Sequence, residues 1–533
     1  MHCANIFCEF VDANFQAISS YLESDKINGL MSQSSFVSTR FARVAVLIFL
    51  FALALGIRLY DLTDLPLDFH PTRQLLSVIK ARGLFYETQP DGISTAQLEA
   101  GIQMAQLKAG VEPVVFERLV AFTYRFTGER IWIARIYSSL FWLIGGKFLF
   151  MLVQELVSFD GALLATAYYL FFPYAIFASR SFQPDPMMVM LILVFCWMFR
   201  QWIRTSAWHY ALLSGLFGGF AIFVKFSAAF FVIGAALGLV SSRFTFRELL
   251  RNTQVWVVAA LGAIPALAYL YYGFVIRGSL GGQFEGRFFP ALLISPLNYL
   301  QWATKVNFAV GGLFIMLGLL SFFLVKEKQM QGLMIGLWSG YLLYGLFFDY
   351  HVATHDYYHL PFIPIVALSL GPVGGWMAAH WTESTRGVGR GVVFIILMYG
   401  LFSVVWDVRN QMKAVDYRPE AAMWAEIAQK LGNEKGAIAL TQDYGSRLEY
   451  WGWRTVTIWP YASDIDYSKL RSGNGTSFDK LFEDYSGKKA LFLVSDFEEL
   501  KNQPELKSKL NGYSIYAQGD GYVIYDLQHP LTH

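Results

Sequence analysis

The chain has 533 residues, of which 55% are hydrophobic and only 15% are charged, with a mean hydropathy of +0.39. Soluble domains carry about 25% charged residues, so this composition predicts an integral membrane protein. A net charge of +2 without a basic stripe argues against nucleic-acid binding. Three cysteines, Cys3, Cys8 and Cys196, cannot build a disulfide framework or a cysteine-based zinc site.

About eleven apolar stretches follow a polar N-terminal segment, and each is read as a membrane span. They lie at about 43–60, 131–156, 161–178, 186–202, 208–224, 226–240, 255–275, 308–325, 333–348, 361–380 and 392–408. We therefore predict a cytoplasmic N-terminal extension at residues 1–42 and a polytopic all-α transmembrane module at residues 43–410.

Basic residues near alternate span ends orient the chain, because short cytoplasmic loops are rich in Lys and Arg. The basic face is formed by Arg40, Arg43, Arg200, Arg204, Arg243, Arg247, Arg251, Lys326, Lys328, Arg386 and Arg390. With this face inside, an odd number of spans places the N-terminus in the cytoplasm and the first long loop and the C-terminal tail outside. The predicted location is the inner (plasma) membrane.

The tail differs in kind from the rest and predicts a small extracytoplasmic α/β domain at residues 413–533. Helical spacing of apolar residues marks Pro419–Leu431 and a pattern within Asp496–Leu510. Short strands are predicted at Ala437–Leu440, Thr455–Trp459, Ala490–Val494 and Tyr522–Tyr525. The tail has no nucleotide-binding loop and no nucleophile elbow in its sequence.

The loop after the first span, within Leu59–Tyr86, carries the sequence LDFHPTRQ. Asp68 in this loop is the candidate catalytic base, because a carboxylate at the mouth of a membrane cavity can take a proton from an acceptor. His70 and Arg73 beside it are candidates for orienting the substrate. The alternative is a solvated loop with ordinary charges.

Four further charged residues lie before, between or at the ends of predicted spans. Glu112, in GVEPVVFERL, is a substrate-orienting candidate or a loop charge. Arg180 and Asp185, in RSFQPDP, either bind substrate or form an ion pair that closes the turn, since charges between spans need a partner. Lys225, in GGFAIFVKFSAAFF, is a candidate phosphate ligand, and the alternative is a lysine that reaches the membrane interface.

Histidine, aspartate and tyrosine gather in Asp349–Pro364, DYHVATHDYYHLPFIP. His351, His355 and His359 recur at every fourth residue and would share one face of a helix. A metal site completed by carboxylate and water is conceivable, and the alternative is an aromatic belt at the membrane interface. Gln283–Arg287, QFEGR, could contact an acceptor.

Taken together, these segments resemble the membrane glycosyltransferases of the GT-C superfamily, and most of all the branch of protein O-mannosyltransferases and aminoarabinose lipid A transferases. The resemblance covers about residues 43–410. It rests, in chain order, on LDFHPTRQLLSVIKARGLFY, TGERIWIARIYSSLFWLIGG, SRSFQPDPMMVM, GLFGGFAIFVKFS and HDYYHLPFIP. Family members often have an Asp-Glu pair where this chain has Asp68-Phe69-His70, and His-Pro-Pro where it has Glu112-Pro113-Val114.

The resemblance implies transfer of one sugar, with inversion, from a polyprenyl-phosphate sugar to an acceptor. It assigns the role of catalytic base to Asp68, and binding of the donor phosphate to Lys225 and Arg180. The remaining candidates are His355 and Tyr358 for the phosphate or sugar, and Asp185, His70, Arg73, Glu112 and Asp356 for orienting the substrates. No cofactor is assigned, and a divalent metal stays open because the departures fall at the family's acidic and histidine motifs.

Two other function classes stay open from the sequence. A transporter or flippase of a lipid-linked substrate also places charges within spans, but repeated halves are typical of that class and none is evident here. A non-catalytic cell-envelope assembly protein would have no reason to keep Lys225 and Asp185 at apolar span ends. The acceptor is open among protein, lipid and glycan.

Overall fold

The computed structural model describes residues 37, 39–108, 110, 112–278, 280–281, 287–384, 388–432, 436–472, 476–487 and 489–531. The expectations for the N-terminal extension before residue 37 and for Gln283–Gly286 fall outside the described residues.

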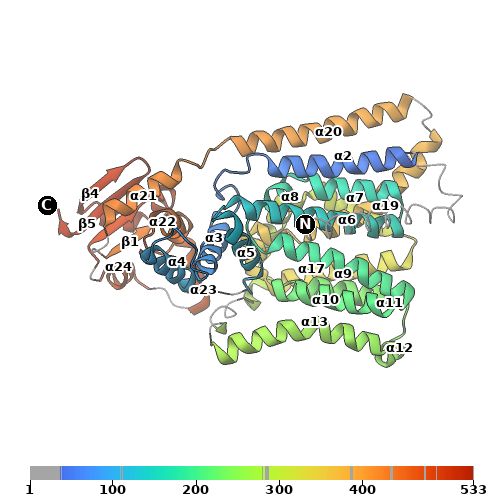
Figure 1. Cartoon of the computed structure of the whole chain (residues 1–533), viewed down its shortest axis with the longest axis horizontal. Coiled ribbons are helices and arrows are strands. Elements are labelled where there is room, and N and C mark those ends of the chain that lie inside the picture. The colour runs from blue at the N-terminus through green and yellow to red at the C-terminus, as the bar shows by residue number, and fades with distance from the viewer. Residues whose placement is uncertain are drawn as a thin grey trace.

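A bundle of apolar helices makes up the larger part of the fold (Figure 1). In chain order its helices are α2 (Arg40–Leu59), α6 (Trp132–Leu156), α7 (Phe159–Phe171), α8 (Pro173–Ala178), α9 (Asp185–Thr205), α10 (Trp208–Val224), α11 (Ala228–Ser241), α12 (Phe246–Arg251), α13 (Thr253–Tyr271), α15 (Pro296–Val310), α16 (Gly312–Leu320), α17 (Lys328–Phe347), α18 (Asp349–Thr354), α19 (Phe362–Ser384) and α20 (Val388–Lys413). Short turns of other helix types, η2 (Tyr272–Ile276), η3 (Pro290–Ile294), η4 (Ser321–Phe323) and η5 (Asp356–His359), connect some of them.

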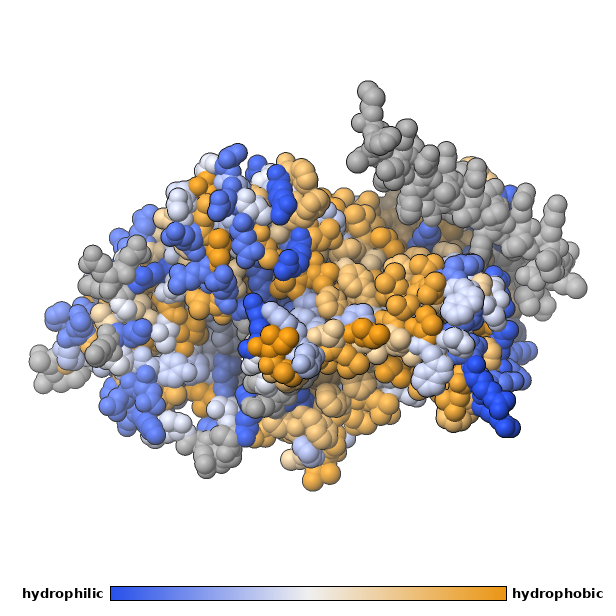
Figure 2. All heavy atoms as spheres, turned by 60° about the horizontal axis from the view of Figure 1, so that its bottom comes forward, coloured by the Kyte–Doolittle hydropathy of each residue, from blue (hydrophilic) through white to orange (hydrophobic). Residues whose placement is uncertain are grey.

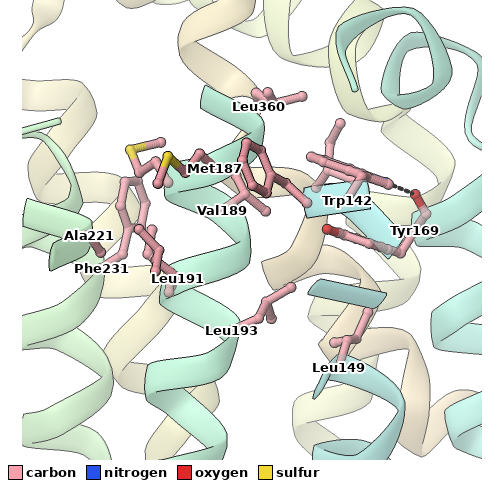
Figure 3. Packing of buried hydrophobic residues seen from close by; sticks show 14 of the residues in the cluster. Trp142, Leu149, Tyr169, Met187, Val189, Leu191, Leu193, Ala221, Phe231 and Leu360 are labelled. Carbon is pink, nitrogen blue, oxygen red and sulfur yellow. Dashed lines mark hydrogen bonds between the residues drawn. The ribbon is translucent and has the colours of Figure 1, made fainter. Parts of the chain in front are cut away.

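The bundle is packed around α9, whose side chains are almost all buried. Beside it, Trp142 of α6 and Tyr169 of α7 stack with their ring centroids 4.3 Å apart. The Trp142 Nε1–H donates to the Tyr169 carbonyl at 3.0 Å (Figure 3). A buried indole needs such a partner for its N–H, so this pair fixes α6 against α7 and thereby the turn that leads into α9.

The number of membrane spans differs from the eleven expected. In the described part of the chain, five helices are long and apolar enough to cross a membrane, or six if α15 and α16, bent by 90°, form one span. Two further helices, α10 and α11, are apolar but shorter. The sequence counted apolar runs, whereas the structure breaks some of them; the run at 161–178, for example, is divided at Pro173. The count of eleven is therefore not confirmed.

The surface of the bundle suits contact with lipid. Apolar side chains gather over its helices in Figure 2, while polar ones lie toward both ends. Leu237 of α11, Leu313 of α16 and Ile395 of α20 are each more than 60% exposed. A contiguous exposed apolar surface of this kind is typical of membrane-embedded helices.

Three helices lie between the bundle and the C-terminal domain (Figure 1). They are α3 (Pro71–Tyr86), α4 (Thr95–Leu107) and α5 (Val115–Thr127). The predicted loop therefore contains a helix, which begins at Pro71, because proline at the first helical position gives up an N–H that would have no partner there. His70 precedes it with φ of 43°, an uncommon value for a residue other than glycine.

The tail forms an α/β domain with a five-stranded sheet in the order β2-β1-β3-β5-β4. Its strands are β1 (Ala437–Leu440), β2 (Thr457–Ile458), β3 (Leu491–Val494), β4 (Tyr513–Gly519) and β5 (Tyr522–Pro530). Its helices are α21 (Glu420–Leu431), α22 (Ser446–Gly452), α23 (Ala462–Ser472), α24 (Phe478–Ser486), α25 (Phe497–Lys501) and α26 (Pro504–Leu510), with the short turn η6 (Gln442–Gly445) after β1. β1 is parallel to β2 and β3, and β5 is antiparallel to β3 and β4.

The sheet is covered on both faces, which is why β1 and β3 are buried at every position. Ala437 and Ala439 face a cluster that contains Trp424 of α21. Ile438 and Leu440 face the opposite cluster, which contains Trp459 and the helices after it.

Polar contacts attach the α/β domain to α3 and the first loop. Arg82 of α3 donates to the Tyr450 carbonyl at 2.7 Å, and its guanidinium lies 3.6 Å from the centre of the Tyr450 ring. Arg418, just before α21, donates to Asp61 Oδ1 at 2.5 Å. Thr72 Oγ1 donates to Asp443 Oδ1 at 2.8 Å. These contacts hold the α/β domain against α3 and the first loop, at one end of the bundle.

Candidate functional site

A cavity of about 900 Å³ lies where the bundle meets the α/β domain. Four basic side chains and two carboxylates are among its described lining residues, together with several aromatic rings. The lining residues are Thr72, Arg73, Glu112, Lys225, Phe226, Ser227, Arg287, Phe348, Tyr350, His351, Thr354, His355, Tyr357, Tyr358, Tyr444, Ser463, Asp464, Tyr467 and Arg471. Its charge favours an anionic ligand.

Lys225 lies in this wall because α10 ends there. The residue is extended, with φ of −154° and ψ of 118°, and α11 begins three residues later. Lys225 Nζ donates to Asp185 Oδ1 at 2.7 Å and lies 4.0 Å from Glu112 Oε1. It also lies 5.6 Å from the ring centres of Tyr357 and Tyr358. The ammonium is thus held in a fixed position at the cavity wall.

Arg73 and Glu112 form the neighbouring ion pair. Arg73 Nη2 donates to both carboxylate oxygens of Glu112, at 3.0 Å and 3.2 Å. Burial alone would raise the pKa of Glu112, but the charges of Arg73 and Lys225 outweigh it and lower that pKa from 4.5 to about 2. Glu112 is therefore ionised at neutral pH and holds both cations in place.

Arg287 and two histidines continue the part of the wall that belongs to the bundle. Arg287 Nη1 lies 3.3 Å from the Tyr358 hydroxyl and 3.2 Å from His351 Nε2. Burial, with the charge of Arg287, lowers the pKa of His351 to about 3, and burial, with the charge of His70, lowers that of His355 to about 4. Both imidazoles are neutral at pH 7, so the arginine supplies the charge here.

The three histidines would share one helix face only if their segment were a single helix, and it is not. α18 ends at Thr354 and a short turn follows, so the histidines do not share one helix face. His351 and His355 line the cavity, whereas His359 is fully buried between the Tyr341 hydroxyl and the Val352 carbonyl. In the described part of the chain, no group of three or more metal-ligating side chains gathers.

His70 and Asp356 pair beside the cavity. His70 Nε2 lies 2.6 Å from Asp356 Oδ1, and the His70 ring contacts the Tyr357 ring at 4.9 Å between centroids. The two predicted residues, 286 positions apart in sequence, are therefore neighbours, and they support the ring that faces Lys225.

Asp68 and Arg180 form a separate cluster, and neither is among the described residues that line the cavity. Asp68 Oδ1 accepts from Arg135 Nη2 at 3.0 Å, and Asp68 Oδ2 lies 3.8 Å from Arg180 Nε. Arg180 Nη2 donates to the Asp61 carbonyl at 3.1 Å. The predicted ion pair of Arg180 with Asp185 is not formed; Asp185 binds Lys225 instead.

Of the predicted site residues, the cavity thus brings together Lys225, Arg73, Glu112, His355 and Tyr358. Sequence reasoning named Arg287 only as the last residue of QFEGR, a segment that could contact an acceptor, and did not predict a place for it beside Lys225. It also missed the contribution of the α/β domain, because nothing in the tail's sequence indicates that it folds over the bundle.

An apolar groove of about 560 Å³ follows the seam between α11 and α17. The two helices approach closely at glycines; a Cβ added to Gly336 would lie 2.0 Å from the Gly234 carbonyl oxygen. At the start of α11 the two linings are adjacent in the chain, since Ser227 lines the cavity and Ala229 lines the groove. The groove therefore starts one helical turn from Lys225 and runs along α11, away from the α/β domain.

Comparison with known proteins agrees with the resemblance predicted from the sequence. Residues 111–272 match the model of a family described as dolichyl-phosphate-mannose-protein mannosyltransferase. No curated protein sequence matches the chain significantly.

Solved structures match nearly the whole chain. ArnT from Cupriavidus metallidurans has a TM-score of 0.53 at 14% identity bound to undecaprenyl phosphate, with 90% of this chain and 97% of that chain covered. The structure of the same protein in the apo state has a TM-score of 0.54 at 15% identity, with 91% of this chain and 98% of that chain covered. A third structure is the oligosaccharyltransferase AglB from Archaeoglobus fulgidus in complex with an inhibitory peptide and a dolichol-phosphate. It has a TM-score of 0.51 at 10% identity, with 91% of this chain and 74% of that chain covered. The chain shares their fold, and the predicted GT-C resemblance is confirmed.

Proposed function

We propose that this chain is an integral membrane glycosyltransferase that moves one sugar from a polyprenyl-phosphate donor to an acceptor. One observation carries the proposal: a cavity with four basic side chains adjoins an apolar groove in the membrane-facing bundle. A polyprenyl-phosphate sugar has a matching form, with a long apolar chain, one phosphate and a polar head.

The donor phosphate binds at Lys225 and Arg287, and the prenyl chain lies in the groove between α11 and α17. Charge-assisted hydrogen bonds from these cations stabilise the charge that grows on the leaving phosphate. Asp185 and Glu112 hold Lys225 at the required place. The ArnT structure bound to undecaprenyl phosphate, which has the same fold, supports a lipid carrier of this class.

The reaction is a single displacement. The acceptor oxygen attacks the anomeric carbon from the side opposite the phosphate, and a new carbon–oxygen bond forms. The bond between the anomeric carbon and the phosphate oxygen breaks, and its electron pair stays on the phosphate. The acceptor proton passes to a carboxylate, and attack from the opposite side inverts the anomeric centre.

Two carboxylates are candidates for this base. The sequence favours Asp68, which stays a prediction. The geometry favours Glu112, because Glu112 lines the cavity and Asp68 is not among the described residues that line it. We propose that Glu112 receives the proton and that Asp68 positions the first loop.

The membrane orientation follows from the same reasoning. α12, with Arg247 and Arg251, lies at the end of the bundle away from the α/β domain (Figure 1). Because basic loops stay in the cytoplasm, the cavity and the α/β domain face the outside of the plasma membrane. At that face a lipid-linked donor needs no soluble nucleotide sugar.

The proposal is tested with the purified chain in lipid nanodiscs. A panel of polyprenyl-phosphate hexoses and pentoses is added with a membrane extract that supplies acceptors, and release of polyprenyl phosphate is measured by mass spectrometry. Release from at least one donor supports the proposal, and no release from any donor contradicts it. Glu112→Gln should lower release at least 100-fold, while Asp68→Asn should keep measurable release; the reverse order would return the base to Asp68.

A further inference from the structure

The α/β domain supplies one wall of the cavity. Tyr444, Ser463, Asp464, Tyr467 and Arg471 all line it, opposite Lys225 and Arg73. The proposed function uses only the wall that belongs to the bundle. The donor contacts proposed above, at Lys225 and Arg287, therefore leave the second wall unused.

This wall is built at the carboxyl ends of the parallel strands. From β1 the sheet order runs to β2 on one side and to β3 on the other, so the chain changes direction between β1 and β3. Open α/β sheets bind ligands at such a switch point, outside the carboxyl ends of the strands. Here η6 follows β1 and α23 follows β2, and both lie over the cavity.

The turn after β1 is held in an unusual backbone conformation. Asp443 and Tyr444 have φ of 53° and 52°, values that are rare for residues other than glycine. Asp443 accepts from Thr72 Oγ1 at 2.8 Å and from Arg447 Nε at 2.5 Å. Such a conformation persists only where its surroundings fix it, and in this case they turn the Tyr444 side chain to the cavity wall.

The polar groups of this wall are oriented by their neighbours. Asp464 Oδ1 accepts from the Tyr444 hydroxyl at 3.1 Å, and Oδ2 accepts from the Tyr461 N–H at 3.1 Å. Each carboxylate oxygen has a further lone pair for a ligand. The Tyr467 and Tyr350 rings lie 4.9 Å apart between centroids, and the Arg471 guanidinium lies 5.9 Å from the centre of the Tyr467 ring.

We propose that this wall is the acceptor subsite and that the acceptor is a saccharide, an inference that rests on the proposed function. A sugar ring has apolar C–H faces, which pack on aromatic rings, and hydroxyl groups, which donate to a carboxylate. A few polar groups among aromatic side chains fix the orientation of a small ligand in this way. A peptide added to the sheet would need a long free edge, and the strand nearest α23, β2, has two residues.

The experiment uses the full chain in nanodiscs and a panel of methyl glycosides of hexoses, N-acetylhexosamines and deoxyhexoses, with binding followed by saturation-transfer NMR. At least one glycoside should bind, both with and without undecaprenyl phosphate. Tyr467→Ala and Asp464→Asn should each weaken that binding at least tenfold and leave undecaprenyl phosphate binding within twofold. Lys469→Ala is the matched control, because Lys469 lies on α23 in an exposed pair with Asp466.

Three results would overturn the inference. The first is that no glycoside binds. The second is that undecaprenyl phosphate displaces the bound glycoside. The third is that Tyr467→Ala and Asp464→Asn leave glycoside binding unchanged. Binding of a Ser/Thr-rich peptide in place of the glycosides, lost in the same variants, would also overturn the saccharide assignment. Failure of the wild-type chain to bind undecaprenyl phosphate would instead count against the proposed function, so the two failures are distinguishable.

Discussion

Replacing Lys225 by methionine should weaken binding of the lipid phosphate by a factor set by one charged contact. A hydrogen bond to a charged group contributes about 1.5–3 kcal/mol, which corresponds to about a 10- to 150-fold rise in Kd. The same change also leaves Asp185 without its partner, and the Asp185 side chain is only 1% exposed. Breaking a buried ion pair in this way costs about 3–5 kcal/mol of stability.

The double variant Lys225→Met/Asp185→Asn separates the two effects. It removes the uncompensated carboxylate, so the chain should recover most of the lost stability, while the phosphate still lacks its ammonium. Binding of undecaprenyl phosphate is measured in nanodiscs, with undecaprenol as the control that has the chain but no phosphate. The double variant should bind undecaprenyl phosphate 10- to 150-fold more weakly and undecaprenol as well as wild type does. Equal affinity of the double variant and wild type for undecaprenyl phosphate would refute the phosphate assignment.

Three further results are expected. Gly336→Ala should lower stability by about 1–3 kcal/mol in detergent unfolding, because its Cβ would meet a backbone carbonyl at 2.0 Å; Gly262→Ala, with open space around it, is the control, and equal effects would contradict this close approach. Because the charges of Arg73 and Lys225, outweighing burial, lower the pKa of Glu112 from 4.5 to about 2, its contribution to stability is complete above pH 4.5 and is lost as the pH falls toward 2. Melting curves of Glu112→Gln should lack this part of the acid dependence, and an unchanged dependence would contradict the pairing. An exposed cysteine from Lys480→Cys, in a background without Cys3 and Cys8, should react with an impermeant reagent added outside whole cells, and labelling only after lysis would reverse the orientation.

The sequence predicted the parts of the fold whose signals are local. Apolar runs located most bundle helices. β1 was predicted with its observed bounds because its four residues are all apolar, and they are buried, two toward each face of the sheet. β4 was not predicted; it lies at the edge of the sheet, and most of its residues are exposed. The span count was less predictable, since Pro173 and the 90° bend between α15 and α16 interrupt apolar sequence that reads as continuous.

The candidate site could be predicted only in part, because its contacts join distant positions. Lys225 was recognisable as a lone charge at the end of an apolar span, and Glu112 as a charge in a Gly/Pro segment before the second span. That Asp68 is held by Arg135, 67 residues away, and that Thr72 contacts Asp443, 371 residues away, depends on packing that no local pattern encodes. The wall contributed by the α/β domain could not be predicted for the same reason, because its residues are far in sequence from the others that line the cavity.

The central claim is most directly tested by mass spectrometry of glycans and lipid-linked sugars from cells that lack the gene. The account predicts that one envelope glycan loses a single sugar residue, that the matching polyprenyl-phosphate sugar accumulates, and that wild-type protein but not Lys225→Met/Asp185→Asn restores both. Unchanged glycans and an unchanged donor pool, or full restoration by that double variant, would contradict it.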